Sequence, residues 1–202
     1  FLTDLPNRRY HDAKLTGRDP EAAKGLAILH IDLDRFKEIN DTLGHKAGDH
    51  MLLHAAEVLR RSVGPDDFVA RIGGDEFVIL SDFEGNTAGL SALSERIIRR
   101  MRDPILYNGT VCRVGASIGI ACDPRPEVDA KQLLLNADIA LYRAKSLGRN
   151  RYDFFSIDFQ HQVVNTKRVA DEILTAIERE EFVPYYQLQF SAKTLQITGA
   201  ET

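Results

Sequence analysis

The sequence predicts an α+β fold in which a largely antiparallel sheet is flanked by helices. Amphipathic stretches with the period of a helix are interspersed along the chain with short runs rich in β-branched residues. Two of these runs, residues 68–72 and 77–81, are separated only by the tetrapeptide 73–76, which contains two glycines. This is the pattern of a β-hairpin with a glycine-bearing loop, so we expect neighbouring strands to run in opposite directions.

The chain is expected to open with a helix and a strand. Pro6 suits a first helical turn, residues 7–15 continue the helix, and Gly17 with Pro20 ends it. The next segment, residues 26–34, has the sequence LAILHIDLD, and its alternate side chains are expected on opposite faces of a strand. The apolar face carries Leu29, Ile31 and Leu33, and the polar face carries His30, Asp32 and Asp34. The polar face is an anomaly that calls for an explanation.

Four further helices are expected before residue 150. Residues 36–45 form a short helix ending at Gly44, and a long helix starts at about Asp49. Residues 86–101 and 130–146 follow the hairpin and are also amphipathic. The helix from about Asp49 has an apolar stripe of Leu52, Ala56, Leu59 and Val63, and the helix at 130–146 has one of Leu134, Ala137, Leu141 and Ala144.

Residues 111–122 are predicted to form one strand, because β-branched and small side chains predominate there. Gly115 and Gly119 inside it indicate either bulges or places where another part of the backbone comes close. Residues 151–155 are expected to close the sheet. Beyond them, residues 157–180 predict a long helix, followed by two strand-like runs, FVPYYQLQF and TLQITGAE.

The composition is that of an ordinary globular protein. With 202 residues, 44% of them hydrophobic and 28% charged, the chain can bury a core and is not a disordered segment. It has neither the run of about 20 apolar residues that spans a membrane nor a signal-peptide layout, so we expect no membrane partner for this segment and a cytoplasmic location. Membrane attachment through further segments of a longer protein stays open. Cys112 and Cys122 lack C-x-x-C spacing and are expected to be reduced, and a net charge of −4 argues against a nucleic-acid partner.

Three carboxylates stand out as candidate metal ligands or catalytic groups. Asp32 lies toward the end of its strand, and Asp75 and Glu76 occupy the hairpin loop. Gathered carboxylates repel one another, so a fold that collects several usually supplies a cation. Hard oxygen donors suit Mg²⁺ or Mn²⁺ better than Zn²⁺. On these residues alone, the alternative that they are solvated turn residues stays open.

Three ordered blocks are similar to one known family. They are IDLDRFKEINDTLGHKAGD, RIGGDEF and LYRAKSLGRNRY, and they lie within about residues 1–156, after the opening LPNRR. Together they resemble the GGDEF family of diguanylate cyclases, whose signature is complete at residues 73–77. The resemblance implies a nucleotide-cyclase fold, ferredoxin-like and similar to a polymerase palm. It also implies condensation of two GTP molecules into cyclic di-GMP with release of pyrophosphate, with Mg²⁺ or Mn²⁺ as cofactor.

The resemblance assigns roles to matching positions. It implies that the metal is held by Asp32, Asp75 and Glu76 together with the backbone carbonyl of Leu33. It places Glu76, Asp75 and Lys37 in catalysis, with Glu76 taking the proton of the attacking 3′-hydroxyl. The chemistry agrees, because attack on an α-phosphorus needs a base, a cation on the phosphate oxygens and in-line geometry.

Other positions match GTP-binding residues of the family. Lys37, Lys145 and Arg149 match phosphate-binding positions, and the last two lie four residues apart at a helix end, where we expect them to face the same way. The alternative is that the lysines near helix ends merely interact with the helix dipole. The remaining matching positions are Asn40, His45, Asp49, Gly73 and Gly74. Of these, the resemblance implies that Asn40 and Asp49 hydrogen-bond the guanine base, His45 is a possible nucleotide contact, and the glycines leave room for a ligand.

Two features depart from a complete match or suggest a different ligand. Many relatives bind their product at an inhibitory R-x-x-D motif, but here Gly64 replaces the arginine while Asp67 is retained, so product inhibition by that route is doubtful. His50 and His54 have a helical spacing compatible with zinc. A zinc site is disfavoured because H-E-x-x-H and a third ligand are missing.

Residues 182–202 look like the opening strands of an EAL-type cyclic di-GMP phosphodiesterase domain, with Glu201 at the glutamate of the E-A-L motif and Thr202 at its alanine. The expected division is therefore a cyclase domain at 1–156, a connecting helix at 157–181 and a truncated EAL start at 182–202. A two-fold symmetric product made from two GTP favours a homodimer that pairs two half-sites. The alternative function is a GTP-binding regulatory domain that controls an adjoining phosphodiesterase without turning over nucleotide.

Overall fold

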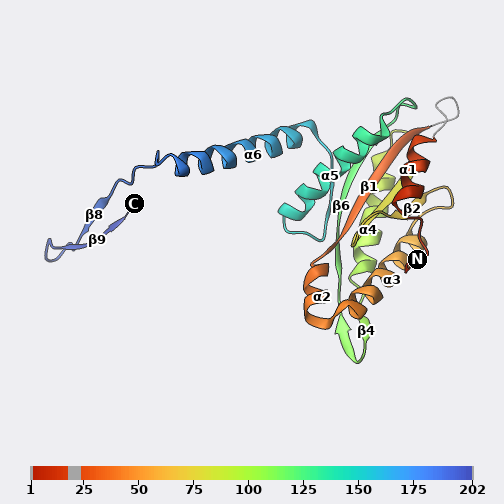
Figure 1. Cartoon of the computed structure of the whole chain (residues 1–202), viewed down its shortest axis with the longest axis horizontal. Helices are drawn as coiled ribbons and strands as arrows, with labels where there is room; N and C mark the ends of the chain where they lie inside the picture. The colour runs from red at the N-terminus through yellow and green to blue at the C-terminus, as the bar shows by residue number, and fades with distance from the viewer. Residues whose placement is uncertain (1, 18–23, 202) are drawn as a thin grey trace. The chain divides into compact units, whose positions relative to one another are not determined.

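A computed structural model describes residues 2–17 and 24–201 (Figure 1). The chain divides into two compact units that meet between Phe159 and Gln160, and each is described by itself. Pro20 and Thr202, which carried two of the sequence interpretations, lie outside the described residues.

The first unit contains one five-stranded sheet in the order β2-β3-β1-β6-β7 and a separate two-stranded hairpin, β4-β5. Its elements are α1 (Arg8–Thr16), β1 (Gly25–Asp34), α2 (Phe36–Leu43), α3 (His45–Ser62), β2 (Phe68–Arg71), β3 (Glu76–Phe83), α4 (Thr87–Met101), β4 (Ile105–Tyr107), β5 (Thr110–Cys112), β6 (Gly115–Asp123), α5 (Ala130–Ser146) and β7 (Tyr152–Phe154). The β1–β3, β1–β6 and β2–β3 pairs are antiparallel, and only β6–β7 is parallel. The predicted α+β fold with a largely antiparallel sheet is confirmed.

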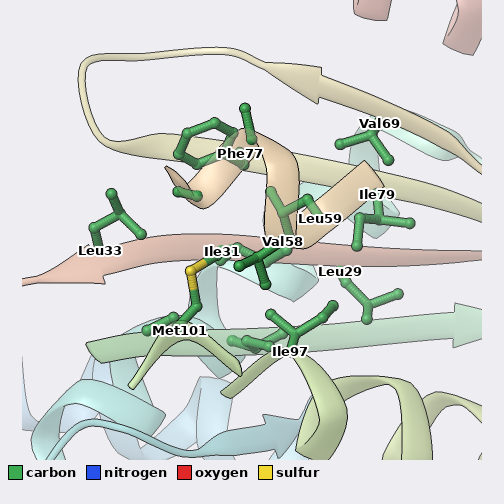
Figure 2. Close-up of a cluster of buried hydrophobic side chains, with 14 of the residues drawn as sticks. Leu29, Ile31, Leu33, Val58, Leu59, Val69, Phe77, Ile79, Ile97 and Met101 are labelled. Carbon is green, nitrogen blue, oxygen red and sulfur yellow. The ribbon is translucent and has the colours of Figure 1, made fainter. Parts of the chain in front are cut away.

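Strand β1 is the centre of the core, since all ten of its residues are buried. One hydrophobic cluster lies between the sheet and helices α3 and α4, and it includes Leu29, Ile31 and Leu33 from the apolar face of β1. Figure 2 shows these three side chains with Phe77 and Ile79 of β3, Val58 and Leu59 of α3, and Ile97 and Met101 of α4. A second cluster, on the opposite face of the sheet, includes Leu26 and Ile28 with side chains of α1 and α5. Helices therefore cover both faces.

Helix α3 begins at His45, four residues before the expected start at about Asp49. The physical reason is Gly44, whose φ of 84° lets α2 end and α3 begin at one residue. The first turn of α3 shows a single apolar side chain, Ala47, so the apolar stripe becomes evident only further along. The helix expected over residues 130–146 has those same bounds in α5.

The single strand expected over residues 111–122 is wrong, because the segment contributes β5 to one sheet and β6 to another. Strand β5 pairs with β4, which the sequence analysis missed. Asn108 and Gly109 between them have φ values of 48° and 81°, so this Asn-Gly pair forms a tight hairpin turn. An Asn-Gly pair between short apolar runs was the signal for it.

The two glycines of β6 mark close approaches and no bulge, since the pairing of β1 with β6 runs without a register shift from Leu26–Asp123 to Asp34–Gly115. A Cβ atom at Gly119 would overlap the backbone of α5 at Ala137 and Leu141. Glycine at this position is what lets α5 pack directly on the sheet.

The long helix α6 (Ile157–Glu178) begins at the end of the first unit, and β8 (Gln187–Phe190) pairs antiparallel with β9 (Ile197–Glu201) in the second. The second unit exposes many large apolar side chains, among them Phe182, Tyr185, Tyr186, Leu188 and Leu195. Within residues 2–17 and 24–201, no helix has the length and apolar character to span a membrane.

Candidate active site

The hairpin between β2 and β3 brings the candidate carboxylates together. In the β1–β3 register Asp32 lies opposite Glu76, and the backbone N–H of Leu33 donates to the carbonyl of Asp75 at 3.2 Å. Two segments more than 40 residues apart in sequence thus meet at the end of β1. The resulting site contains every metal-ligand candidate predicted from the sequence.

Arg71 holds the hairpin turn and was missed by the sequence analysis. Its guanidinium donates to the carbonyl of Gly73 at 3.2 Å and to that of Gly74 at 3.1 and 2.7 Å. These bonds fix the backbone immediately before Asp75, since a guanidinium presents several donors in a rigid plane. An arginine two residues before the glycine pair was the available signal.

Asp32 is a largely buried carboxylate with a raised pKa. Its side chain is only 12% exposed, and burial raises its pKa above the usual value for aspartate. Lys145, whose Nζ lies 2.6 Å from Asp32 Oδ2, lowers the pKa, while the charges of Asp75 and Asp34 raise it further. A buried carboxylate surrounded by like charge favours a cation beside it.

The donor set fits a magnesium ion bound together with phosphate. Asp32 and Asp75 offer carboxylate oxygens and Leu33 offers a backbone carbonyl, all hard donors. Among the described residues, no group of three or more His, Cys, Asp or Glu side chains could by itself hold a metal. Mg²⁺ is usually held by one or two carboxylates plus substrate phosphates and water, so this smaller set is compatible with Mg²⁺.

Gly73 and Gly74, the two glycines of the hairpin, differ in the space around their Cα atoms. A Cβ atom at Gly73 would lie 2.5 Å from Glu76 Oε2, so the carboxylate of Glu76 folds back over that position. A Cβ atom at Gly74 would meet nothing within 4 Å, and Gly74 is exposed. Packing within the protein therefore explains Gly73 and leaves Gly74 with open space in front of it.

Helices α2 and α3 pack together at Asn40 and Gly48. The side chain of Asn40 lies against Gly48, where a Cβ atom would overlap Asn40 Oδ1 and approach the ring of Phe36 to 3.1 Å. Gly48 was not singled out in the sequence, although it directly precedes Asp49. The remaining candidates on these helices, Lys37 and His45, are exposed, as is Asp49.

Lys145 and Arg149 do not share a helix face, so the expectation that they point the same way from a helix end is wrong. Helix α5 ends at Ser146, and Arg149 follows in a left-handed conformation with φ of 63°. Lys145 contacts Asp32, while Arg149 lines a groove of about 520 Å³ that Asp34, Arg35 and Arg113 also line. The two cations reach different parts of the same strand end.

The polar face of β1 is explained by α5 and the turn that follows it. His30 Nδ1 lies 3.4 Å from Asp138 Oδ1, and Asp32 pairs with Lys145. Asp34 accepts hydrogen bonds from Ser117 Oγ at 2.7 Å and from the backbone N–H of Asn150 at 2.9 Å. Each polar side chain of the strand thus anchors a successive part of residues 138–150.

Gly64 and Asp67 form a turn in which the backbone N–H of Gly64 donates to Asp67 Oδ2 at 2.7 Å. The retained aspartate is therefore engaged within its own turn. On α3, the ring of His50 lies 5.6 Å from that of Tyr107, and burial lowers the pKa of His54. Neither histidine belongs to a metal cluster within the described part of the chain.

A sequence model of the family described as "Diguanylate cyclase, GGDEF domain" matches residues 1–151. The chain belongs to the GGDEF family. The "Signaling protein YkoW" of Bacillus subtilis is 38% identical over 99% of this chain, and the "Bifunctional diguanylate cyclase/cyclic di-GMP phosphodiesterase MucR" of Pseudomonas aeruginosa is 36% identical over 99%. The chain covers 26% and 30% of these two proteins, respectively.

The fold of the GGDEF relatives is the same. The solved GGDEF domain of TpbB from Pseudomonas aeruginosa is 36% identical, with a TM-score of 0.72 over 80% of this chain and 96% of that one. The nucleotide-cyclase fold expected from the resemblance is confirmed. Membership of the GGDEF family places the chain in cyclic di-GMP signalling.

Proposed function

We propose that the first unit is an active diguanylate cyclase that condenses two GTP molecules into cyclic di-GMP and releases pyrophosphate. One observation carries the proposal: a complete GGDEF hairpin faces Asp32 across β1 and β3, with the ammonium of Lys145 at the same carboxylate. This arrangement gathers acid, base and cation where a triphosphate needs them.

Each proposed site residue has a separate role in the condensation of GTP. Asp32, Asp75 and the Leu33 carbonyl would hold Mg²⁺ or Mn²⁺, with Glu76 as a further ligand candidate, and the ion would neutralise charge on the phosphate oxygens. Glu76 takes the proton of the attacking 3′-hydroxyl. Lys37, Lys145 and Arg149 balance the negative charge of the triphosphate.

Recognition of the base falls to the helix pair α2–α3. Asn40 offers an amide and Asp49 a carboxylate, which together match the acceptor and donor edge of guanine. His45 at the start of α3 is a further contact candidate, and the open space at Gly74 leaves room for the ligand beside Gly73. GTP is therefore preferred over ATP.

The proposal is tested by incubating the protein with GTP and Mg²⁺ and separating the products by chromatography. Cyclic di-GMP and pyrophosphate are expected from the wild type, and Glu76→Gln is expected to lose most of the rate. Ser81→Ala, on the same strand outside the site, is the control. Unchanged GTP at high protein concentration would sink the cyclase proposal.

A homodimer is part of the proposal, because one site binds one GTP and the product is a symmetric ring of two. Turnover per chain is expected to fall on dilution. A constant turnover per chain through the range in which the protein becomes monomeric would contradict the dimer.

We also propose that residues 182–201 begin an EAL-type phosphodiesterase domain. The β8–β9 pair supports this, as does the relative named as bifunctional, whose similarity extends over 99% of this chain. All proposed site residues lie before residue 160, so a chain ending at residue 159 should keep its turnover. Loss of turnover in that chain would show that the cyclase domain extends further.

Relatives that are named only as cyclic di-GMP phosphodiesterases support a second candidate, a GTP-binding domain that regulates an adjoining phosphodiesterase. This second candidate predicts that the protein binds GTP tightly but forms no cyclic di-GMP. Calorimetric titration with GTP, run beside the product assay, separates the two candidates.

A further inference from the structure

Asp34 lies two residues from Asp32 on the same face of β1 and has no role in the proposed mechanism. We propose that Asp34 is a positioning residue, which clamps the turn at 148–150 and thereby places Arg149 for contact with the nucleotide phosphates. The phosphate target rests on the proposed function, whereas the clamp itself rests on contacts within the chain.

The contacts of Asp34 join three separate segments. Asp34 is 8% exposed, Ser117 of β6 is fully buried, and Asn150 belongs to the turn after α5. One carboxylate oxygen accepts from Ser117 Oγ at 2.7 Å and the other from the backbone N–H of Asn150 at 2.9 Å. A buried donor left without an acceptor is costly, so the carboxylate that accepts both bonds can determine the position of a loop.

The turn needs such an anchor, because its backbone is left-handed at three successive residues. The φ values are 111° at Gly148, 63° at Arg149 and 51° at Asn150. Non-glycine residues adopt this conformation at a cost and keep it where surrounding contacts impose it. The N–H of Arg149 is held by the carbonyl of Ala144 at 3.1 Å, and that of Asn150 by Asp34 with help from Ser117 Oγ at 3.2 Å.

Gly115 gives independent support for the clamp. It is the register partner of Asp34, and a Cβ atom there would lie 2.9 Å from Asp34 Oδ2 and 3.3 Å from Asn150 Oδ1. Its φ lies outside the left-handed region, so no backbone conformation requires glycine. The missing side chain instead leaves the space in which Asp34 and Asn150 meet.

The clamp sets where the guanidinium of Arg149 can go. Arg149 lines the groove beside Asp34 together with Arg35 and Arg113, and within the described residues no carboxylate forms an ion pair with it. Asp34 lies two strand positions beyond Asp32, a separation of about 7 Å. A triphosphate bound at Asp32 is thus within the reach of an arginine side chain extending from this turn.

Hydrogen exchange tests the clamp without any nucleotide. In Asp34→Asn an amide NH₂ faces one of the two donors, so exchange at the Asn150 amide is expected to accelerate by about tenfold or more. Asp138→Asn is the matched control, since it alters another polar contact between β1 and α5 and should leave Asn150 unchanged. Equal exchange at Asn150 in wild type and Asp34→Asn would overturn the clamp.

A second experiment tests whether Arg149 contacts the nucleotide phosphates. It measures binding of a GTP analogue with a methylene bridge between the α and β phosphorus atoms. By calorimetry, Asp34→Asn and Arg149→Ala are each expected to weaken binding about tenfold, and the double variant also about tenfold, because both act through one guanidinium. A double variant weakened about a hundredfold would show independent effects and overturn the positioning role. A wild type that binds no analogue overturns the proposed function and the phosphate target together, while the Asn150 exchange still decides whether the clamp exists.

Discussion

Lys145 Nζ lies 2.6 Å from Asp32 Oδ2, and this ion pair joins the last full turn of α5 to the central strand of the sheet. It shows how the fold tolerates a buried carboxylate next to two others. Burial and the charges of Asp75 and Asp34 raise the pKa of Asp32, and the ammonium offsets only part of that effect. The charged form of Asp32 is therefore destabilised in the folded protein, and a bound cation would stabilise it.

We predict that the same aspartate-to-asparagine substitution has opposite effects on stability at Asp32 and at Asp34. Because the pKa of Asp32 is raised by folding, its favourable contribution to stability is present at acid pH and is lost as pH rises through the folded pKa. At neutral pH, Asp32→Asn should keep or raise the melting temperature while cyclic di-GMP synthesis is lost. Asp34→Asn, two residues along the same face, should lower the melting temperature, because the new amide NH₂ faces one of the two donors that the Asp34 carboxylate accepts from. Thermal unfolding of both variants checks this, and an equal loss of stability in both would contradict it.

Substitution of Gly48 is predicted to weaken nucleotide binding without unfolding the protein. In Gly48→Ala the new methyl group would overlap Asn40 Oδ1 at the α2–α3 contact. Displacement of Asn40 should weaken binding of the methylene GTP analogue by about tenfold or more, because a misplaced polar contact loses its hydrogen bond. Gly89→Ala on α4 is the control: its methyl group meets nothing within 4 Å, and alanine stabilises a helix by roughly 0.5–1 kcal/mol relative to glycine. Unchanged analogue affinity in Gly48→Ala would show that Asn40 does not contact the base.

His54 predicts a pH-dependent part of the stability. Burial lowers its pKa, while the Arg100 backbone and the Asp103 charge raise it and His50 lowers it further. The folded state thus binds a proton at His54 less readily than the unfolded chain, so stability should decline as pH falls through 6.5 toward the lower folded pKa. Urea unfolding between pH 8 and pH 5 should show a shallower decline in His54→Leu than in the wild type. Parallel curves would contradict the assignment.

The turn at Gly64 predicts that product inhibition can be introduced. A Cβ atom there would lie 3.4 Å from Asp67 Oδ2, an ordinary contact, so the position accommodates a Cβ atom. Gly64→Arg supplies the guanidinium that the R-x-x-D pattern lacks. Added cyclic di-GMP should slow GTP turnover in Gly64→Arg and leave the wild type unaffected, with Gly64→Gln as the control of similar length. Inhibition of the wild type by its product at a similar concentration would sink this prediction.

The sequence predicted most helices and strands correctly by type, but it predicted their boundaries less well. The amphipathic pattern of α4, the apolar stripe of α5 and the glycine loop of the hairpin identified their elements, because each signal is local in the sequence. The start of α3 was misplaced, since Ala47 alone marks its first turn. Strand β4 and the break between β5 and β6 were missed, because the hairpin signal at Asn108 and Gly109 was overlooked inside an apparently continuous β-rich segment.

The α+β class, the family and the identities of the candidate site residues follow from local patterns, because the blocks around Asp32, the GGDEF hairpin and Lys145 are each contiguous in the chain. How these blocks meet depends on long-range packing. The contact of Lys145 with Asp32 and the bond from Asn150 to Asp34 span more than 110 residues each, and no local pattern encodes them. Likewise, Gly48, Gly115 and Gly119 are explained by the atoms that lie against them. Side-chain periodicity reports which face of an element is buried, whereas the partner on that face is set by packing of the whole chain.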